Sequence, residues 1–272
     1  MKKINFIISK KRNEKISKII YYFENLSYKF LDESVKFEIF SDKLDQDIPL
    51  LKKICIDVNY TLEKVSVKNW IKEVKKKDIS SETELFIFHQ GFKDISTTKN
   101  KIIIPAGLSF GTGSHQSTIL IIKIFEKLNK KIVFNFPLDI GTGTGILSFI
   151  LNKKLKKKIY ATDISSDSKD NFEKNKKINK LNNLLFFKSF GMNNINLKKK
   201  KFDLIVANLL LNEHKSIITN VCKHIKRRGF YFISGILDSQ INYFIVLLRC
   251  FNLRLYDSMK LNGWACLVFR KY

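Results

Sequence analysis

The sequence predicts an α/β protein in which a Rossmann-like domain with a mostly parallel sheet follows a smaller ferredoxin-like α+β domain. Residues 137–147, PLDIGTGTGIL, join an apolar strand to a helix through a glycine-rich turn, as at the start of a nucleotide-binding βαβ unit. Alternating strand and helix patterns continue from there to the end of the chain. We therefore expect one domain at 1–66, a linker helix and connecting strand at 67–100, and the larger domain at 101–272.

Length and composition are compatible with two domains that each have a core. The chain has 272 residues, of which 44% are hydrophobic. No apolar run approaches the roughly 18 residues of a membrane span, so we expect a soluble, cytoplasmic protein without a membrane partner. The four cysteines, Cys55, Cys222, Cys250 and Cys266, lie far apart without a C-x-x-C pair, so we expect neither a metal site nor a disulfide framework.

The formal net charge of +25 at pH 7 favours anionic partners such as nucleic acid. Lys, Asn, Ile and Phe are all abundant, however, which is a pattern that AT-rich codons produce. Lysine runs at 75–77, 156–158 and 198–201 fall where loops are expected, and we interpret them as solvated loops. The charge therefore allows nucleic-acid contact without specifying it.

Six short patterns predict the first domain. Alternating or apolar runs predict four strands, and apolar residues at helical spacing predict two helices, in the order βαββαβ. The strands are expected at 2–8, 27–31, 35–40 and 59–67, and the helices at 13–23 and 48–56. Pro49 would then lie in the first turn of the second helix, where proline is tolerated.

Such a module also occurs in RNA-binding proteins, where stacking aromatic residues accompany a glycine in one strand. The strand at 35–40 has Phe37 and Phe40 but no glycine. Phe37 shares a strand face with Val35 and Ile39, so we predict that it lies in the core. We favour a protein-binding or scaffold role for this domain.

The segment between the domains carries a basic pattern. Residues 68–77 are typical of a short amphipathic helix, against which Trp70 is expected to pack. Strands are expected at 85–89 and 101–104. This linker is a candidate hinge.

Residues 107–118, GLSFGTGSHQST, are rich in small and flexible residues and precede an apolar helix at 119–128. Ser117 and Thr118 are natural caps for that helix. The density of such residues around Phe110 goes beyond a cap and favours a ligand-covering loop. His115, whose ordinary pKa is close to neutrality, is either a general base or a structural hydrogen-bonding residue, and we favour the second role.

The glycine-rich turn contains Gly141, Gly143 and Gly145. Glycine permits positive φ angles and lets the backbone approach a ligand closely. A second strand at 158–164 ends in Asp163, about twenty residues after the first glycine, where nucleotide-binding folds place an acid on the ribose hydroxyls. Asp139 precedes the turn, either as part of the motif or as a plain polar strand end. The spacing G-x-G-x-G differs from the dinucleotide pattern and resembles the first motif of S-adenosylmethionine-dependent methyltransferases.

The rest of the chain completes five β/α units. Helices are expected at 167–178, 213–225 and 239–250, and strands at 184–190, 202–210, 230–235, 254–261 and 264–270. Asn208 lies at the end of the apolar strand at 202–210, at the sheet edge where open α/β folds bind ligands. Asn262 and Gly263 form a two-residue hairpin turn, so the last strand must be antiparallel to its neighbour.

Several motifs together resemble the PrmA family of bacterial methyltransferases over nearly the whole chain. They are FGTGSHQST, DIGTGTGIL, ATDIS, VANLL, SGIL followed by Gln240, and GWACLVFRK. The resemblance implies a class I methyltransferase domain, with S-adenosylmethionine as cofactor. This chain has His115-Gln116-Ser117-Thr118 where the family usually reads HPTT, GTGTG where it reads GCGSG, and Ser165-Ser166 after the ribose acid where it has Asp-Pro.

By this resemblance, Thr118, Gly141, Asp163 and Asn208 fall where the family binds the cofactor. We expect the nearby Gly143, Gly145, Phe110 and Thr112 to line the same site. Asn208 and His115 are the candidates for positioning the substrate amine.

The resemblance further implies methylation, up to trimethylation, of lysine and N-terminal amino groups of ribosomal protein eleven of the large subunit, by a monomer whose first domain recognises the substrate. Only a neutral amine can attack a methyl group, so the site must favour the uncharged form. Three alternatives remain: another protein target, RNA methylation, and a non-catalytic ribosome-binding protein.

Overall fold

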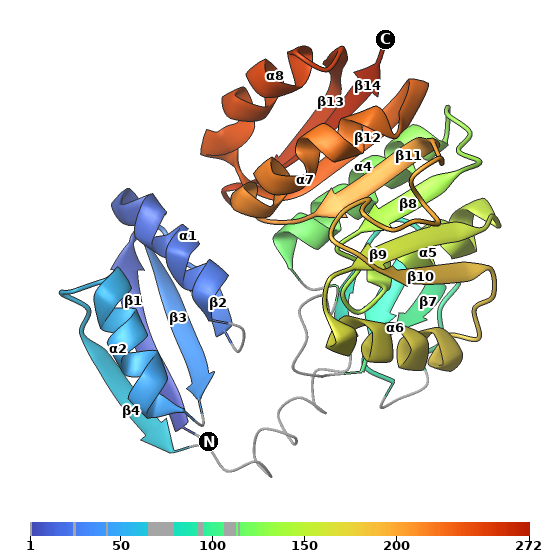
Figure 1. Ribbon diagram of the computed structural model, residues 1–272. Helices are drawn as coiled ribbons and strands as arrows, with labels where there is room; N and C mark the ends of the chain where they lie inside the picture. Colours follow the sequence, from blue (N-terminus) through green and yellow to red (C-terminus); the bar gives the residue numbers. More distant parts are fainter. Residues whose placement is uncertain are drawn as a thin grey trace. The chain divides into compact units, whose positions relative to one another are not determined.

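The computed structural model describes residues 2–23, 26–41, 43–64, 79–91, 95–105, 113 and 115–272. The chain divides into two compact units, Met1–Lys77 and Asp78–Tyr272. Figure 1 shows the elements of both units, coloured along the sequence. The predicted linker helix at 68–77 and Trp70 lie outside the described residues.

The first unit has the predicted βαββαβ order. Its elements are β1 (Lys2–Ser9), α1 (Asn13–Tyr22), β2 (Leu26–Phe30), β3 (Ser34–Ser41), α2 (Leu44–Ile54) and β4 (Tyr60–Lys64), with a 3-10 turn at Lys10–Arg12. The strands form an antiparallel sheet in the order β2-β3-β1-β4, which is the ferredoxin-like arrangement. Phe37 is fully buried and stacks on Phe6 at 5.1 Å between ring centroids, so its predicted core position is confirmed.

The prediction for Pro49 was wrong, because α2 begins at Leu44 and Pro49 lies inside the helix. The backbone N–H groups of Gln46 and Asp47 already donate to the Lys43 carbonyl. Asp45 and Asp47 in the first turn favour this earlier start, since carboxylates interact well with the positive end of a helix. The apolar spacing used for the prediction detects only the part of the helix that packs on the core.

The second unit contains a seven-stranded sheet in the order β10-β9-β8-β11-β12-β14-β13. The strands are β8 (Pro137–Ile140), β9 (Ile159–Asp163), β10 (Leu184–Lys188), β11 (Phe202–Asn208), β12 (Ile225–Leu237), β13 (Leu253–Leu261) and β14 (Trp264–Lys271). The first five pair in parallel, and β14 is antiparallel to both β12 and β13. Asn262 and Gly263 both have positive φ, 48° and 80°, as the predicted hairpin turn requires.

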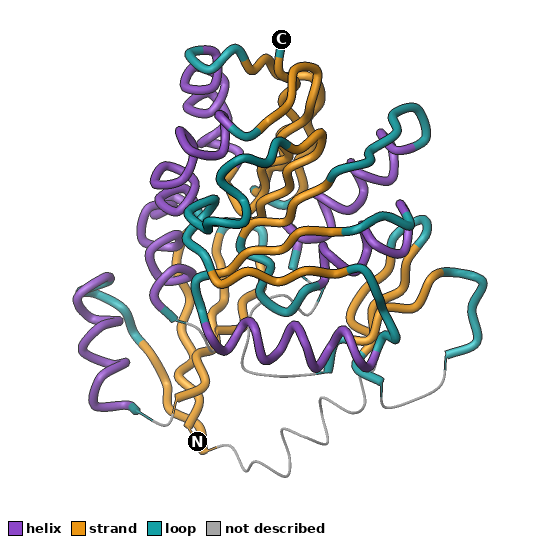
Figure 2. The backbone as a smooth tube through the Cα atoms, turned by 45° about the vertical axis from the view of Figure 1, so that its right-hand side comes forward, coloured by secondary structure: helices purple, strands orange, loops and turns teal. Residues whose placement is uncertain are grey.

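Helices lie on both sides of this sheet (Figure 2). They are α4 (Gln116–Asn129), α5 (Ile146–Leu155), α6 (Ser166–Ile178), α7 (Leu211–Lys223) and α8 (Ile241–Arg249), with a 3-10 turn at Asp238–Gln240. Both sheet faces are therefore covered, and β11 and β12 are buried over most of their lengths. Among the described residues, no helix has the length and apolar character needed to span a membrane.

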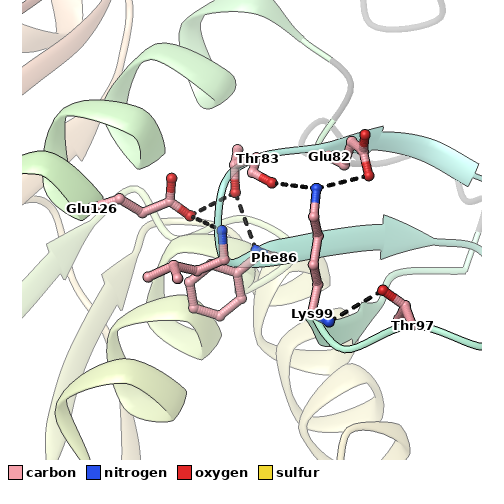
Figure 3. Close-up of polar contacts among 7 residues, drawn as sticks. Glu82, Thr83, Phe86, Thr97, Lys99 and Glu126 are labelled. Atoms are coloured by element: carbon pink, nitrogen blue, oxygen red, sulfur yellow. Dashed lines mark hydrogen bonds and ion pairs between the residues drawn. The ribbon is translucent and has the colours of Figure 1, made fainter.

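A small three-stranded sheet also belongs to the second unit. It consists of β5 (Ile79–Glu82), β6 (Phe86–His89) and β7 (Asn100–Ile103). The sequence did not predict β5, and residues up to 100 were expected to form a connecting segment. The buried Glu126 of α4 accepts hydrogen bonds from the Thr83 hydroxyl (2.7 Å) and the Leu85 N–H (3.0 Å) (Figure 3). Asn179, after α6, bonds both the N–H and the carbonyl of Ile103. These contacts fix the small sheet to the helices of the large one.

Candidate active site

The glycine-rich turn between β8 and α5 has the predicted backbone. Gly141, Gly143 and Gly145 all have positive φ, at 69°, 53° and 92°. A Cβ on Gly141 would overlap the Leu209 side chain. The turn therefore needs glycine both for its backbone angles and for the approach of the segment that follows β11.

Asp139 holds the two ends of this turn together. One of its oxygens, Oδ2, accepts hydrogen bonds from the Thr142 hydroxyl (2.7 Å), the Ser148 hydroxyl (2.7 Å) and the Ser148 N–H (3.0 Å). Complete burial raises the pKa of Asp139 to about 6, although these donors oppose the rise. Asp139 is thus an integral part of the motif rather than a plain strand end.

Asp163, at the end of β9, faces the same turn. Its Oδ2 accepts the Gly143 N–H at 2.9 Å, and its Oδ1 accepts the Ser165 N–H at 3.0 Å. Ser165 in turn caps α6 by accepting from the N–H groups of Asp167 and Ser168. An ionised carboxylate has about four acceptor sites, so Asp163 keeps the capacity to accept two further hydrogen bonds.

Asn208, at the end of β11, contacts the start of α4. Its Nδ2 donates to Thr118 Oγ1 at 3.1 Å, which brings together two residues predicted for one site from distant parts of the sequence. The Asn208 Oδ1 is buried without a hydrogen-bond partner among the described residues. A buried carbonyl oxygen without a donor reduces the stability of the folded protein unless a ligand or a water molecule donates a hydrogen bond to it.

Ser234 of β12 connects the segment that follows β11 to the first turn of α4. Its carbonyl accepts the Leu209 N–H (3.1 Å) and lies 2.9 Å from His214 Nε2, which must therefore carry a proton. Its hydroxyl donates to the Ser117 carbonyl in the first turn of α4 at 2.8 Å. The next residue, Gly235, has φ of 80°, and a Cβ there would overlap the Leu209 backbone. Ser234 thereby fixes the segment after Asn208 relative to the helix that carries Thr118.

His115, rather than Ser117 or Thr118, caps α4. Its Nδ1 accepts the Ser117 N–H at 3.2 Å and lies 2.7 Å from the Ser117 hydroxyl. The ring packs edge-on against Trp264, with centroids 4.7 Å apart, and burial lowers the pKa of His115 to about 4. The ordinary pKa of histidine, close to neutrality, therefore does not apply to His115, because its burial disfavours the charged form.

The family model described as ribosomal protein L11 methyltransferase (PrmA) matches residues 27–272. The chain belongs to this family. The predicted family is confirmed.

Relatives that carry the same name include a protein of Prochlorococcus marinus (strain MIT 9312), 36% identical over 181 residues, a match covering 64% of this chain and 57% of that protein. A relative from Dictyoglomus turgidum is 26% identical over 242 residues, and the match covers 88% of this chain and 78% of that protein. The chain thus spans little more than half the length of the Prochlorococcus relative. The solved structure of a ribosomal protein L11 methylase from Lactobacillus delbrueckii subsp. bulgaricus has 27% identity and a TM-score of 0.62, covering 70% of this chain and 97% of that one.

These similarities confirm the predicted α/β fold as that of a class I methyltransferase. Phe110 and Thr112 lie outside the described residues, so their place in the site stays a prediction. Sequence reasoning missed Ser234, Gly235 and His214. The motif SGIL contains the first two, and a serine followed by glycine inside a buried strand was the available signal.

Proposed function

We propose that the chain is an S-adenosylmethionine-dependent methyltransferase that modifies lysine side-chain and N-terminal amino groups of ribosomal protein L11. Membership of the family and the names of its relatives support this activity. The observation that carries it most directly is a pair of contacts at one sheet edge, in which the glycine turn bonds Asp163 of β9 and Asn208 of β11 bonds Thr118 of α4. Open α/β sheets bind their ligands at this edge.

The residues present fit the proposed cofactor. A ribose offers two O–H donors, and the Asp163 carboxylate has acceptor capacity beyond its two backbone bonds. The glycine turn allows close approach of a ligand, and the unpaired Asn208 Oδ1 provides a further acceptor. Thr118, Gly141, Gly143 and Gly145 would line the site with Phe110 and Thr112.

When bound, the cofactor supplies a methyl group on a positively charged sulfur. A lysine side chain has an ordinary pKa of about 10.4, so a site poor in water favours its neutral, reactive form. Asn208 would orient the amine, and the proton would leave to solvent. His115 would not serve as a general base, because its Nδ1 already accepts the N–H of Ser117. Alignment would therefore provide most of the catalysis.

We propose that the first unit recognises the protein substrate and that the enzyme acts as a monomer in the cytoplasm. The residues predicted for the cofactor site all belong to 101–272, so the first unit is available for another role. A variant lacking 1–66 should bind S-adenosylmethionine with unchanged affinity in calorimetry. It should methylate ribosomal protein L11 far more slowly than the full chain, and an equal rate would contradict this division of roles.

The activity can be tested with methyl-labelled S-adenosylmethionine and whole ribosomes. After incubation, ribosomal protein and RNA are separated and counted. We expect label in the protein fraction, and in the L11 band within it. Label in RNA would support RNA methylation, label in another band would indicate a different protein target, and cofactor binding without transfer would indicate a non-catalytic ribosome-binding protein.

A further inference from the structure

A cluster of arginine and aromatic side chains lies at the opposite sheet edge from Asp163 and Asn208. We call it the arginine–tyrosine cluster, and it comprises Arg228, Phe230, Arg254, Tyr256, Arg270 and, after the end of β14, Tyr272. The strands β12, β13 and β14 that carry the other five residues are labelled in Figure 1. In the parallel pairing of β11 with β12, Leu204 lies opposite Phe230, whereas Asn208 lies opposite Ser234. The cluster is therefore near the amino ends of the parallel strands and separate from the proposed methylation site.

The guanidinium group of Arg270 is surrounded by three aromatic rings. Its Cζ lies 5.5 Å from the ring centroid of Phe230, 6.0 Å from that of Tyr256 and 5.9 Å from that of Tyr272. Arg254 has the same relation to Tyr272, at 5.1 Å. Stacking on rings uses the faces of a guanidinium group and leaves its in-plane N–H groups able to donate to a ligand. The Nε of Arg270 is buried without a hydrogen-bond partner among the described residues.

Two carboxylates lie beside this cluster, since Asp203 lines the same cavity as Arg228 and Arg270, and Asp257 follows Tyr256 in β13. Both have other partners. Asp203 accepts the N–H groups of Asn135 and Phe136, and Asp257 pairs with Lys127 at 2.7 Å. In the part of the chain that the structure describes, no ion pair joins Arg228, Arg254 or Arg270 to an acid.

Two of these arginines also lie opposite each other. Arg254 pairs directly with Arg270 in the register of β13 and β14. Like charges in this position repel each other. An anionic ligand bound between them would relieve the repulsion.

The backbone exposes the cluster to solvent. The register of β13 shifts between Leu255 and Asp257, so Tyr256 is the extra residue of a bulge, and it is 45% exposed. Tyr272 is 56% exposed. Between the pairs Phe202–Ile225 and Leu204–Phe230 the register also shifts, so residues 226–229 of β12 form a bulge in which Arg228 is exposed and has a positive φ of 62°. A cavity of about 190 Å³ is lined by Arg228, Tyr256 and Arg270, with the Asp203 carboxylate also in its wall.

We propose that the arginine–tyrosine cluster binds single-stranded RNA, with guanidinium groups on phosphates and the two tyrosine rings against bases. Planar donors match phosphate oxygens, and every base has a face that stacks on an aromatic ring. An acidic peptide would satisfy the arginines but would leave the exposed rings unused. The proposal assigns a binding role to part of the +25 net charge. It does not depend on the methylation activity.

The test measures fluorescence anisotropy of a labelled oligouridine titrated with the full-length protein. One variant is Arg254→Gln/Arg270→Gln, and a second is Tyr256→Leu. The matched control is Lys174→Gln/Lys177→Gln, which removes two exposed charges from α6. Binding of S-adenosylmethionine and the unfolding temperature show that each variant is folded.

We expect the arginine pair and Tyr256→Leu each to weaken binding by about tenfold or more. The arginine pair should also reduce the slope of log K against log salt concentration by about 0.7 for each phosphate that the variant no longer neutralises. The lysine control should change little. If the arginine pair and the lysine control weaken RNA binding equally, the attraction is a diffuse effect of charge and the proposal is overturned. Absence of RNA binding, or complete competition by polyglutamate, would also overturn it.

Discussion

Asn208 donates a hydrogen bond to Thr118 over 3.1 Å and so joins the end of β11 to the first turn of α4. The two residues are 90 positions apart in the sequence. The hydrogen bond leaves the Asn208 Oδ1 as a buried acceptor beside the glycine turn.

Thr118→Val removes the acceptor without changing the size of the side chain. The part-buried Asn208 Nδ2 would lose its acceptor, and a hydrogen bond of this kind contributes about 0.5–1.5 kcal/mol to stability. We expect denaturant unfolding to show a loss of that order and calorimetry to show weaker binding of S-adenosylmethionine. Thr118→Ser, which keeps the hydroxyl, is the control and should retain most of the affinity. A valine variant as stable and as tightly binding as the wild type would exclude this role for the pair.

Asp163→Ala should weaken cofactor binding by about 1.5–3 kcal/mol, or roughly ten- to a hundredfold, because hydrogen bonds to a charged acceptor would be lost. The substitution also removes the acceptor for the Gly143 N–H. Asp163→Asn keeps one acceptor oxygen and should fall between the alanine variant and the wild type. Asp170→Ala, on the exposed part of α6, controls for the change of charge. An unchanged dissociation constant for Asp163→Ala in isothermal calorimetry would contradict the role of Asp163 in cofactor binding.

Ser234→Ala should loosen the connection between β12 and α4. The Ser117 carbonyl would lose its hydroxyl donor, a net cost of about 1 kcal/mol. We expect weaker cofactor binding beyond this loss of stability, since Thr118 follows Ser117 directly. Ser216→Ala, which removes an exposed hydroxyl from α7, is the matched control. If both variants bind cofactor equally well, Ser234 has only a local structural role.

His115→Ala should lower the methylation rate only modestly. The cap on α4 would be lost, at about 1 kcal/mol of stability, but no proton acceptor for the reaction would disappear. The value of kcat/KM should rise from neutral to alkaline pH in both proteins, because the neutral amine is the reactive form and the pKa of His115, lowered to about 4, lies below this range. A loss of about a hundredfold or more, the size expected for a general base, with the alkaline rise abolished and cofactor affinity intact, would overturn the positioning mechanism.

The parts of the site that could be predicted are those that follow from the ends of parallel strands. Asp163 and Asn208 each end a strand, and carboxyl ends of parallel strands meet at one edge. The residue type of the three glycines was enough to predict a turn with positive φ. The closing hairpin could be predicted in the same way, from the residue types of Asn262 and Gly263.

The parts that were missed depend on contacts between distant segments. Ser234 acts through the Ser117 carbonyl, and no local pattern links residues 117 positions apart. The low pKa of His115 results from its burial near Trp264, which ordinary propensities do not reveal. The early start of α2 before Pro49 depends on polar residues that carry no apolar periodicity.

The most direct test of the account is the intact mass of purified ribosomal protein L11 after incubation with this enzyme and S-adenosylmethionine. We expect successive increases by one methyl group, mapped by peptide fragmentation to lysine side chains and the N-terminal amine. Asp163→Ala at low cofactor concentration should slow these increases, and Asp170→Ala should not. An unchanged mass of the ribosomal protein, in the presence of a folded enzyme shown by calorimetry to bind the cofactor, would contradict the proposed function.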